Sequence, residues 1–376
     1  MSDPDPGEPV REDLVDVLRL ALVPGVGPRT RRALLDHFGS SAAVLRAPAS
    51  RLREVPGVGP KLAAKITAAS EEIDAEEEIE LCRQGGVAIV TDAEPEYPRP
   101  LREIAAPPAV LFFRGSWEPR DAIAVAIVGT RHGTPYGLRQ AERLAGSLAR
   151  AGLTIVSGLA RGIDAAAHRG ALAAGGRTIA VLGSGVLNIY PPEHRELADQ
   201  VAAHGALISE LPPRAEPLPG VFPQRNRIIS GLALGVMVVE AGERSGALIT
   251  ARHAMEQGRE VFAVPGRIDD RTTLGCHRLI RDGAKLVQSP EDVLEELGPL
   301  VEPAPHGDGR VVHHPAELLL NELETQVLEA IGSDATLIDR IVADTGLSAA
   351  QVLATLSVLE MRHLIRRLSG TTVMRL

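Results

Sequence analysis

The chain has 376 residues, a formal net charge of −9 and an aromatic content of only 2%. That length allows two or three domains, and the two isolated cysteines exclude a disulfide framework or a cysteine metal cluster. No apolar run reaches the length of about 18 residues that spans a membrane, and the start is acidic and Pro-rich rather than a signal peptide. We therefore expect a soluble cytoplasmic protein.

The negative charge is unevenly spread along the chain. Residues 11–65 hold ten Lys and Arg against five Asp and Glu, whereas seven of the ten residues in 71–80 are acidic. The total charge governs solubility, but local patches decide which partners a surface attracts. A net charge of −9 therefore does not exclude a polyanionic ligand.

An internal repeat marks the first part of the chain. "VPGVGPRTRRALLDHFG" at 23–39 recurs as "VPGVGPKLAAKITAA" at 55–69. Pro28 and Pro60 suit the first position of a helix, and the glycines before each suit a tight turn. We predict a helical module over 1–80 with two helix-hairpin-helix units. Such turns expose backbone N–H groups that can hold phosphate, although the same repeat can serve packing alone.

The next two hundred residues alternate short apolar runs with amphipathic stretches. This alternation predicts a mostly parallel, Rossmann-like sheet covered by helices on both faces, over 86–298. The expected strands are at 87–90, 109–113, 123–129, 153–158, 178–183, 206–209, 236–241, 261–266 and 284–287.

The C-terminal part begins with a Pro- and Gly-rich linker, predicted at 299–314. Three helical patterns and a short hairpin then predict a winged helix over 315–376. This segment holds five basic against eight acidic residues, so we expect it to bind duplex DNA weakly and to favour a protein partner. Its expected core positions include Val352, Leu353, Leu356 and Leu359.

Gly- and Ser-rich loops follow four of the predicted strands, at 129–137, 157–164, 183–194 and 240–250. The carboxyl ends of parallel strands share one edge, where open α/β sheets bind ligands, so these loops predict a phosphate or nucleotide site. The sequence contains neither GxxxxGK[ST] nor GxGxxG, so it lacks the patterns for a triphosphate with Mg²⁺ or a dinucleotide. Asp164 is expected to cap the helix after "SGLARG", and His168 to be a packed residue on it.

Several motifs between about 97 and 290 occur in the order typical of one family. They include "AIVGTRHGTPYG", "IVSGLARGIDAAAH", "FPQRNRIISGLA" and "VVEAGERSGALITARHAMEQGREVFAVPG". Together they resemble the DNA-processing protein A family, also called DprA or Smf. The resemblance implies binding of single-stranded DNA during natural transformation, homodimerisation, and delivery of RecA recombinase as a recombination mediator. It implies no catalysis, no cofactor and no metal.

The resemblance also implies roles for individual residues. It implies a site in which backbone N–H groups and side chains surround one phosphate and an aromatic ring offers a face to a base. The residues of this site would be Gly129, Thr130, Arg131, Ser157, Gly158, Arg177, Phe222, Arg225, Asn226 and Arg227. Arginine suits this role because its planar guanidinium bonds phosphate bidentately and stacks on bases. The dimer face would include His277, Ile280 and Leu286.

Three other interpretations remain open at this stage. The arginines of "RNR" could instead cap a helix and pair with acidic residues across the sheet. The sheet could belong to an enzyme acting on a nucleotide or phosphoribosyl substrate, for which Glu240 and Glu243 are the only plausible catalytic carboxylates. The hairpin repeats could make the chain a purely structural duplex-DNA protein, which would leave the loops of the sheet unexplained.

Overall fold

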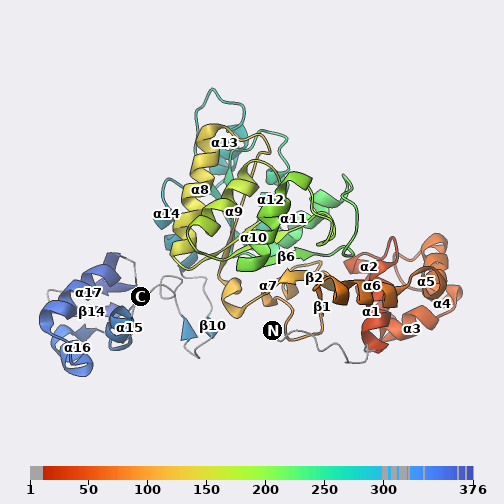
Figure 1. The fold of residues 1–376 in the computed structure, drawn as a ribbon, viewed down its shortest axis with the longest axis horizontal. Coiled ribbons are helices and arrows are strands. Elements are labelled where there is room, and N and C mark those ends of the chain that lie inside the picture. Colours follow the sequence, from red (N-terminus) through yellow and green to blue (C-terminus); the bar gives the residue numbers. More distant parts are fainter. Residues whose placement is uncertain are drawn as a thin grey trace.

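A computed structural model describes residues 12–298, 304–305, 311–312, 320, 322–332, 335–361, 364–368 and 371–375. Figure 1 shows an N-terminal helical module, a central α/β domain and a C-terminal module of helices and short strands. Most of the predicted linker at 299–314 lies outside the described residues, apart from the short strands β10 (Ala304–Pro305) and β11 (Val311–Val312). The domain boundaries themselves stay predictions.

The described part of the N-terminal module, from residue 12 on, contains six helices, and the repeat has the same geometry in both copies. Gly25 and Gly57 both have positive φ, at 105° and 87°, which a glycine adopts without steric cost. Helices then begin at Pro28 and Pro60, as predicted. The helices are α1 (Glu12–Leu22), α2 (Pro28–Phe38), α3 (Ser41–Arg46), α4 (Ala49–Leu52), α5 (Pro60–Glu72) and α6 (Ala75–Gln84).

All nine predicted strands form one sheet, in the order β1-β2-β6-β5-β4-β3-β7-β8-β9. The seven strands from β6 to β9 are parallel, whereas β1 and β2 are antiparallel to their neighbours. The strands are β1 (Ala88–Thr91), β2 (Val110–Gly115), β3 (Ala124–Gly129), β4 (Thr154–Ser157), β5 (Thr178–Val181), β6 (Gly205–Ser209), β7 (Gly235–Val239), β8 (Glu260–Ala263) and β9 (Lys285–Leu286). From β3 the chain adds β4, β5 and β6 on one side, and then β7, β8 and β9 on the other. The strand order therefore reverses between β3 and β7, although these two strands are parallel.

Helices cover both faces of this sheet, which confirms the predicted three-layer α/β fold. One face packs against α7 (Arg99–Arg102), α11 (Val221–Gly231), α12 (Ala247–Glu256) and α13 (Leu274–Arg281). The other packs against α8 (Pro135–Arg150), α9 (Ile163–Ala173), α10 (Arg195–His204) and α14 (Pro290–Leu297), together with α1 and α6. Short 3-10 turns lie at η1 (Pro119–Ala122) and η2 (Pro192–His194).

The helical module is attached to the sheet by packing and by one ion pair. Leu18 of α1 and Cys82 of α6 are buried in the same apolar cluster as β2 residues. Arg31 of α2 donates to both carboxylate oxygens of Asp92, at 2.7 and 3.1 Å, just after β1. The bidentate geometry fixes orientation as well as distance.

The C-terminal module has the predicted three helices and hairpin. It contains α15 (Glu322–Glu329), α16 (Ile338–Thr345) and α17 (Ala349–Met361), with β12 (Thr336–Leu337), β13 (Ile365–Arg367) and β14 (Thr372–Arg375) in one small sheet. Val352, Leu356 and Leu359 are buried as expected, but Leu353 is 43% exposed. Its expected core position was wrong, because it lies one residue outside the i, i+4, i+7 stripe that faces the core.

No single helix among the described residues is long and apolar enough to cross a membrane. Only α16 and α17 taken together have the length and apolar composition for it, and they are bent by 113° at the break between them.

Arg177 lies at the amino end of β5 and forms a buried ion pair there. Its guanidinium donates to both carboxylate oxygens of Asp121, to Glu118 and to the carbonyl oxygen of Ser116, each at 2.7 Å. The loops proposed to hold phosphate follow the carboxyl ends of the strands, at the opposite edge of the sheet. Arg177 directly precedes β5, so a full strand length separates it from the carboxyl end of that strand. The expectation that Arg177 joins the phosphate site is therefore wrong.

We predict that Arg177→Ala destabilises the fold. Asp121 is fully buried, and removing its cation leaves an uncompensated charge, a loss of about 3–5 kcal/mol in the free energy of unfolding. Urea unfolding measures this loss. The matched control is Arg120→Ala, a more exposed arginine that pairs with the same Glu118 at 2.6 Å, whose removal costs less than about 1 kcal/mol. Equal losses in both variants would contradict the assignment.

Candidate functional site

A cavity of about 770 Å³ opens at the carboxyl edge of the sheet, where the strand order reverses between β3 and β7. Open α/β sheets bind ligands at this crevice because the loops on either side diverge to opposite faces. The cavity is lined by the loops after β3, β5 and β7, the start of α9 and the first two turns of α11. The lining residues include Gly129, Thr130, Arg131, His132, Asp164, Tyr190, Phe222, Arg225, Asn226, Arg244 and Ser245.

The loop after β3 is held tightly in place. A Cβ on Gly129 would lie 2.0 Å from the carbonyl oxygen of Val239, so only glycine allows the two strand ends to approach this closely. The N–H of Thr130 donates to the carbonyl oxygen of Glu240 at 2.7 Å. The Glu240 carboxylate in turn accepts bonds from the N–H and hydroxyl of Thr134, at the start of α8. The loop is thereby fixed, and Arg131 and His132 remain exposed at the cavity.

Helix α11 presents one face to the cavity. Phe222, Arg225 and Asn226 line the cavity because residues three and four apart lie on the same side of a helix. Arg227 lies about 140° around the helix from Phe222 and pairs with Glu210 at 2.7 Å instead. The interpretation that the arginines of "RNR" pair with acidic residues thus holds for Arg227, and its expected place in the binding channel was wrong.

Arg225 is a buried cation, with only 6% of its surface exposed. Its Nη1 donates to the carbonyl oxygens of Gly158, at 2.9 Å, and Val181, which end β4 and β5. Its Nε donates to the Asn226 side chain at 3.3 Å, and its Nη2 makes no hydrogen bond to any described residue. The guanidinium is therefore oriented by three acceptors and keeps donors available at the cavity wall.

Electrostatics favour an anion beside Arg225. Burial lowers the pKa of this guanidinium to about 10, the nearby Asp164 carboxylate opposes the shift, and the positive charge of Arg131 adds to it. Burial also raises the pKa of Asp164, against the effect of Arg225 and two backbone N–H groups. A phosphate placed between the two guanidiniums would offset both the burial and the mutual repulsion.

An aromatic surface lies next to these cations. The Phe222 ring packs so closely on the chain at Gly183 that a Cβ there would lie 2.6 Å from it. The Arg131 guanidinium lies 5.3 Å from the centre of the Phe222 ring. The centres of the Tyr190 and Phe222 rings are 5.8 Å apart. An aromatic face beside two guanidiniums matches a nucleotide, with a base on one side and a phosphate on the other.

The expected nest of backbone N–H groups is occupied by protein acceptors. Thr130 N–H is used by Glu240, and Gly158 N–H donates to the Asp164 carboxylate at 3.2 Å. The Ser157 hydroxyl is buried and donates to the carbonyl oxygen of Ile127 at 2.6 Å. Gly158 therefore supports both Arg225 and Asp164, Ser157 ties β4 to β3, and the guanidiniums of Arg131 and Arg225 face the cavity as donors. The predicted direct contacts from Ser157, from Gly158 and from the Thr130 N–H were wrong.

Asp164 and His168 both have structural partners. Gly162, and not Asp164, is the N-cap of α9, and Asp164 accepts bonds from the loop that precedes the helix. His168 is fully buried, as expected, and its Nδ1 lies 2.7 Å from the Thr178 hydroxyl. That hydroxyl donates to the carbonyl oxygen of Ile155, so His168 carries its proton on Nδ1.

Tyr190 and Arg244 were missed by the sequence analysis. Each lies in a loop that follows a strand, in "LNIYPPEH" and "EAGERSGALIT", and each lines the cavity. Aromatic residues are so scarce in this chain that one in the loop that follows β5 is a usable signal for Tyr190. Arg244 has no comparable sign, because a lone arginine in a loop is common.

The residues of the predicted dimer face lie at one edge of the sheet. Leu286 is on β9, the last strand, and is 40% exposed. Ile280 is half-buried against the core, and the His277 Nε2 lies 3.0 Å from the carbonyl oxygen of Gly266. Among the described residues, no three His, Cys, Asp or Glu side chains cluster as a metal site.

Three family models match the chain. A model described as DNA recombination-mediator protein A matches residues 88–298, which is more than half of the sequence. A model described as DprA winged helix domain matches 311–371, and one described as SAM-like helix-hairpin-helix tandem matches 17–72. The three matches follow the three modules seen in the structure.

Curated proteins and solved structures agree with these matches. Protein Smf of Synechocystis sp. is 38% identical over 94% of this chain and 96% of its own length. The structure of DNA processing protein A from Streptococcus pneumoniae is 35% identical, with a TM-score of 0.66 over 77% of this chain and all but 1% of its own. DNA processing protein A from Helicobacter pylori, whose structure is described for its single-stranded DNA binding mode, is 28% identical, with a TM-score of 0.52 over 57% of this chain and 97% of its own.

We predict that His168 makes the fold sensitive to acid. Burial lowers the His168 pKa to about 3, with smaller effects from His194 and Arg225, whereas the unfolded chain titrates near the ordinary value of 6.5. Between these two pH values the unfolded state binds one more proton, so stability falls as the pH drops, by about 1.4 kcal/mol per pH unit.

The test compares urea unfolding of the wild type and His168→Asn at about pH 6.5 and pH 4.5. Asn keeps a donor near Nδ1 but cannot titrate, so the wild type should lose about 2–3 kcal/mol more than the variant over this interval. His204→Asn, at an exposed position of α10, serves as control and should follow the wild type. An equal loss in wild type and His168→Asn would disprove the prediction.

Proposed function

Because the chain belongs to the DNA recombination-mediator protein A family, also called DprA or Smf, we propose that it binds single-stranded DNA in the cavity between β3 and β7. The observation that carries this proposal is the convergence of Arg131 and Arg225 beside the Phe222 ring. Neither guanidinium has a carboxylate within salt-bridge distance among the described residues. A phosphate would supply the missing counter-charge.

The geometry suits a strand of any sequence. Arg131 and Arg225 would hold the phosphate, with Arg244 at the far rim, and Phe222 and Tyr190 would offer ring faces to adjacent bases. Every base has a face that can stack, at about 1–3 kcal/mol each, and every nucleotide has a phosphate. The binding we propose therefore depends on exposed base faces as well as phosphates, and single strands expose their base faces whereas duplexes keep them stacked.

We further infer that this binding serves recombination during natural transformation. In this proposal the protein acts in the cytoplasm as a homodimer, protects the incoming strand and loads RecA recombinase onto it. The support is the family membership, together with the single-stranded DNA named for the Helicobacter pylori relative. The helix-hairpin-helix and winged-helix modules would provide additional contacts, to DNA or to a protein.

The proposed role is non-catalytic. The carboxylates that a nucleotide hydrolase would need are engaged elsewhere: Glu240 accepts two bonds from Thr134, and Asp164 accepts two from the backbone before α9. Glu243 is exposed and does not line the cavity. These contacts favour a binding protein over the alternative of an enzyme acting on a nucleotide or phosphoribosyl substrate.

We predict that Arg131→Ala weakens binding of single-stranded DNA and leaves the fold unchanged. Arg131 is exposed, and losing one phosphate contact lowers the slope of log affinity against log salt by roughly 0.7. Fluorescence anisotropy with an oligodeoxythymidine at several salt concentrations measures this slope. The control is Arg227→Ala, which removes the same charge from the far side of α11 and should keep the slope. If Arg131→Ala keeps both slope and affinity, the strand binds elsewhere.

We predict that Leu286→Arg converts a homodimer into a folded monomer. Edge strand β9 leaves backbone groups and an apolar side chain uncovered, and a partner subunit would cover both. Light scattering gives the mass, and circular dichroism checks the fold. Leu353→Arg, on a leucine of similar exposure in the winged helix, is the control and should remain dimeric. A Leu286→Arg protein that stays dimeric would refute this face.

A further inference from the structure

A second cavity, of about 690 Å³, runs between helices α8 and α9. The two helices lie side by side on one face of the sheet (Figure 1). They approach closely because a Cβ on Gly170 would lie 2.3 Å from the carbonyl oxygen of Glu142, and one on Gly146 3.0 Å from that of Gly170. The floor of this α8–α9 groove therefore consists of backbone and small side chains, at Gly146, Gly170, Ala173 and Ala174.

Four arginines form the walls of the groove. Arg139, Arg143 and Arg150 follow one stripe of α8, and Arg169 faces them from α9. Arg143 donates to Gln140 and to the carbonyl oxygen of Gln288, both at 3.0 Å, and Arg150 donates to Ser147. Among the described residues, no carboxylate forms a salt bridge with any of the four. Glu142 is the one acidic residue among the described residues that line the groove, so the four arginines give the groove a positive charge.

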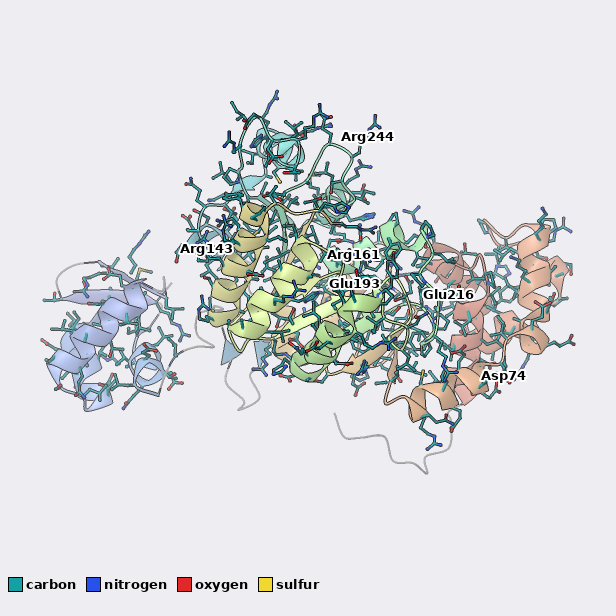
Figure 2. The ribbon with its side chains drawn as sticks, turned by 45° about the horizontal axis from the view of Figure 1, so that its top comes forward. Asp74, Arg143, Arg161, Glu193, Glu216 and Arg244 are labelled. Atoms are coloured by element: carbon teal, nitrogen blue, oxygen red, sulfur yellow. The ribbon has the colours of Figure 1, made fainter. Side chains whose placement is uncertain are left out.

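The groove begins next to the first cavity. Helix α8 starts at Pro135, three residues after His132, and Arg139 lies about 6 Å further along the helix axis. Glu193, before α10, pairs with Arg161, whereas Glu216 and Asp74 lie before α11 and before α6. Figure 2 shows Arg143 on α8, on the other side of the α/β domain from Glu216 and Asp74. Because the arginines of the groove lack salt-bridge partners among the described residues, they would attract a strand that leaves the first cavity along α8.

We propose that the α8–α9 groove binds backbone phosphates of the same single strand whose nucleotides occupy the first cavity. This inference rests on the proposed function. Guanidiniums match phosphate bidentately, and a floor of glycine and alanine lets a backbone approach closely. A protein partner fits less well, because interfaces between proteins are anchored by buried aromatic or large apolar side chains and the groove has none.

The test uses the full-length double variant Arg139→Gln/Arg169→Gln, since neither side chain makes a hydrogen bond to a described residue. Anisotropy titrations compare oligodeoxythymidines of about 6 and about 25 nucleotides over a range of salt. The shorter strand should bind as in the wild type. The longer strand should bind several-fold more weakly, with a salt slope lower by roughly 1.4, because each phosphate contact contributes about 0.7.

The matched control is Arg83→Gln/Arg340→Gln, which removes two exposed arginines that pair within their own helices. It should leave both strands unaffected. Unchanged binding of the long strand by the groove variant, while Arg131→Ala still weakens the short strand, would overturn the groove and leave the proposed function standing. Equal loss for short and long strands would also overturn it.

A competition experiment with poly-L-glutamate tests the commitment to DNA. If this polymer displaces the long strand from the wild type but not from the groove variant, the groove binds acidic polymers in general and the commitment to DNA fails. If the wild type binds neither strand, the proposed function fails as well.

Discussion

The buried guanidinium of Arg225 connects three segments at the centre of the proposed DNA site. It ties α11 to the carboxyl ends of β4 and β5, lies beside Asp164, and holds the Asn226 side chain. Two strand ends, one helix and the loop before α9 are thus positioned around one charge. Burying a cation in this way is costly unless acceptors and counter-charges surround it, and the remaining counter-charge is what a phosphate would bring.

Arginines in this chain have two distinct roles, and the presence or absence of a carboxylate partner distinguishes the two. Arg31, Arg177 and Arg227 are matched with carboxylates and stabilise contacts between segments far apart in sequence. Arg131 and Arg225 in the first cavity, and the four arginines of the α8–α9 groove, have no such partners among the described residues. A protein of net charge −9 can therefore still present cations without carboxylate partners, because some of its acidic residues neutralise the structural arginines.

The order of residues along the chain correctly predicted which loops meet at the carboxyl edge of the sheet. It did not predict which partners each side chain has there. Loops that follow parallel strands must meet, so Gly129, Arg131 and the loop after β7 could be placed together in advance. Arg177 was misplaced because it was assigned from family likeness although it precedes its strand. Ser157 and Gly158 were placed at the correct edge, but their hydrogen-bond partners could not be read from sequence.

Sequence alone determined the three-part organisation, the nine strands, the paired hairpin turns and the edge at which a ligand would bind. These follow from local patterns: apolar periodicity, glycine and proline at turns, and strand polarity. Only the tertiary structure decided which of the arginines are free. Whether a guanidinium meets a carboxylate depends on residues distant in sequence, as with Arg227 and Glu210 or Arg177 and Asp121, and on the helical phase that turns Arg225 inward and Arg227 away. The α8–α9 groove likewise exists only because two glycines let the helices approach.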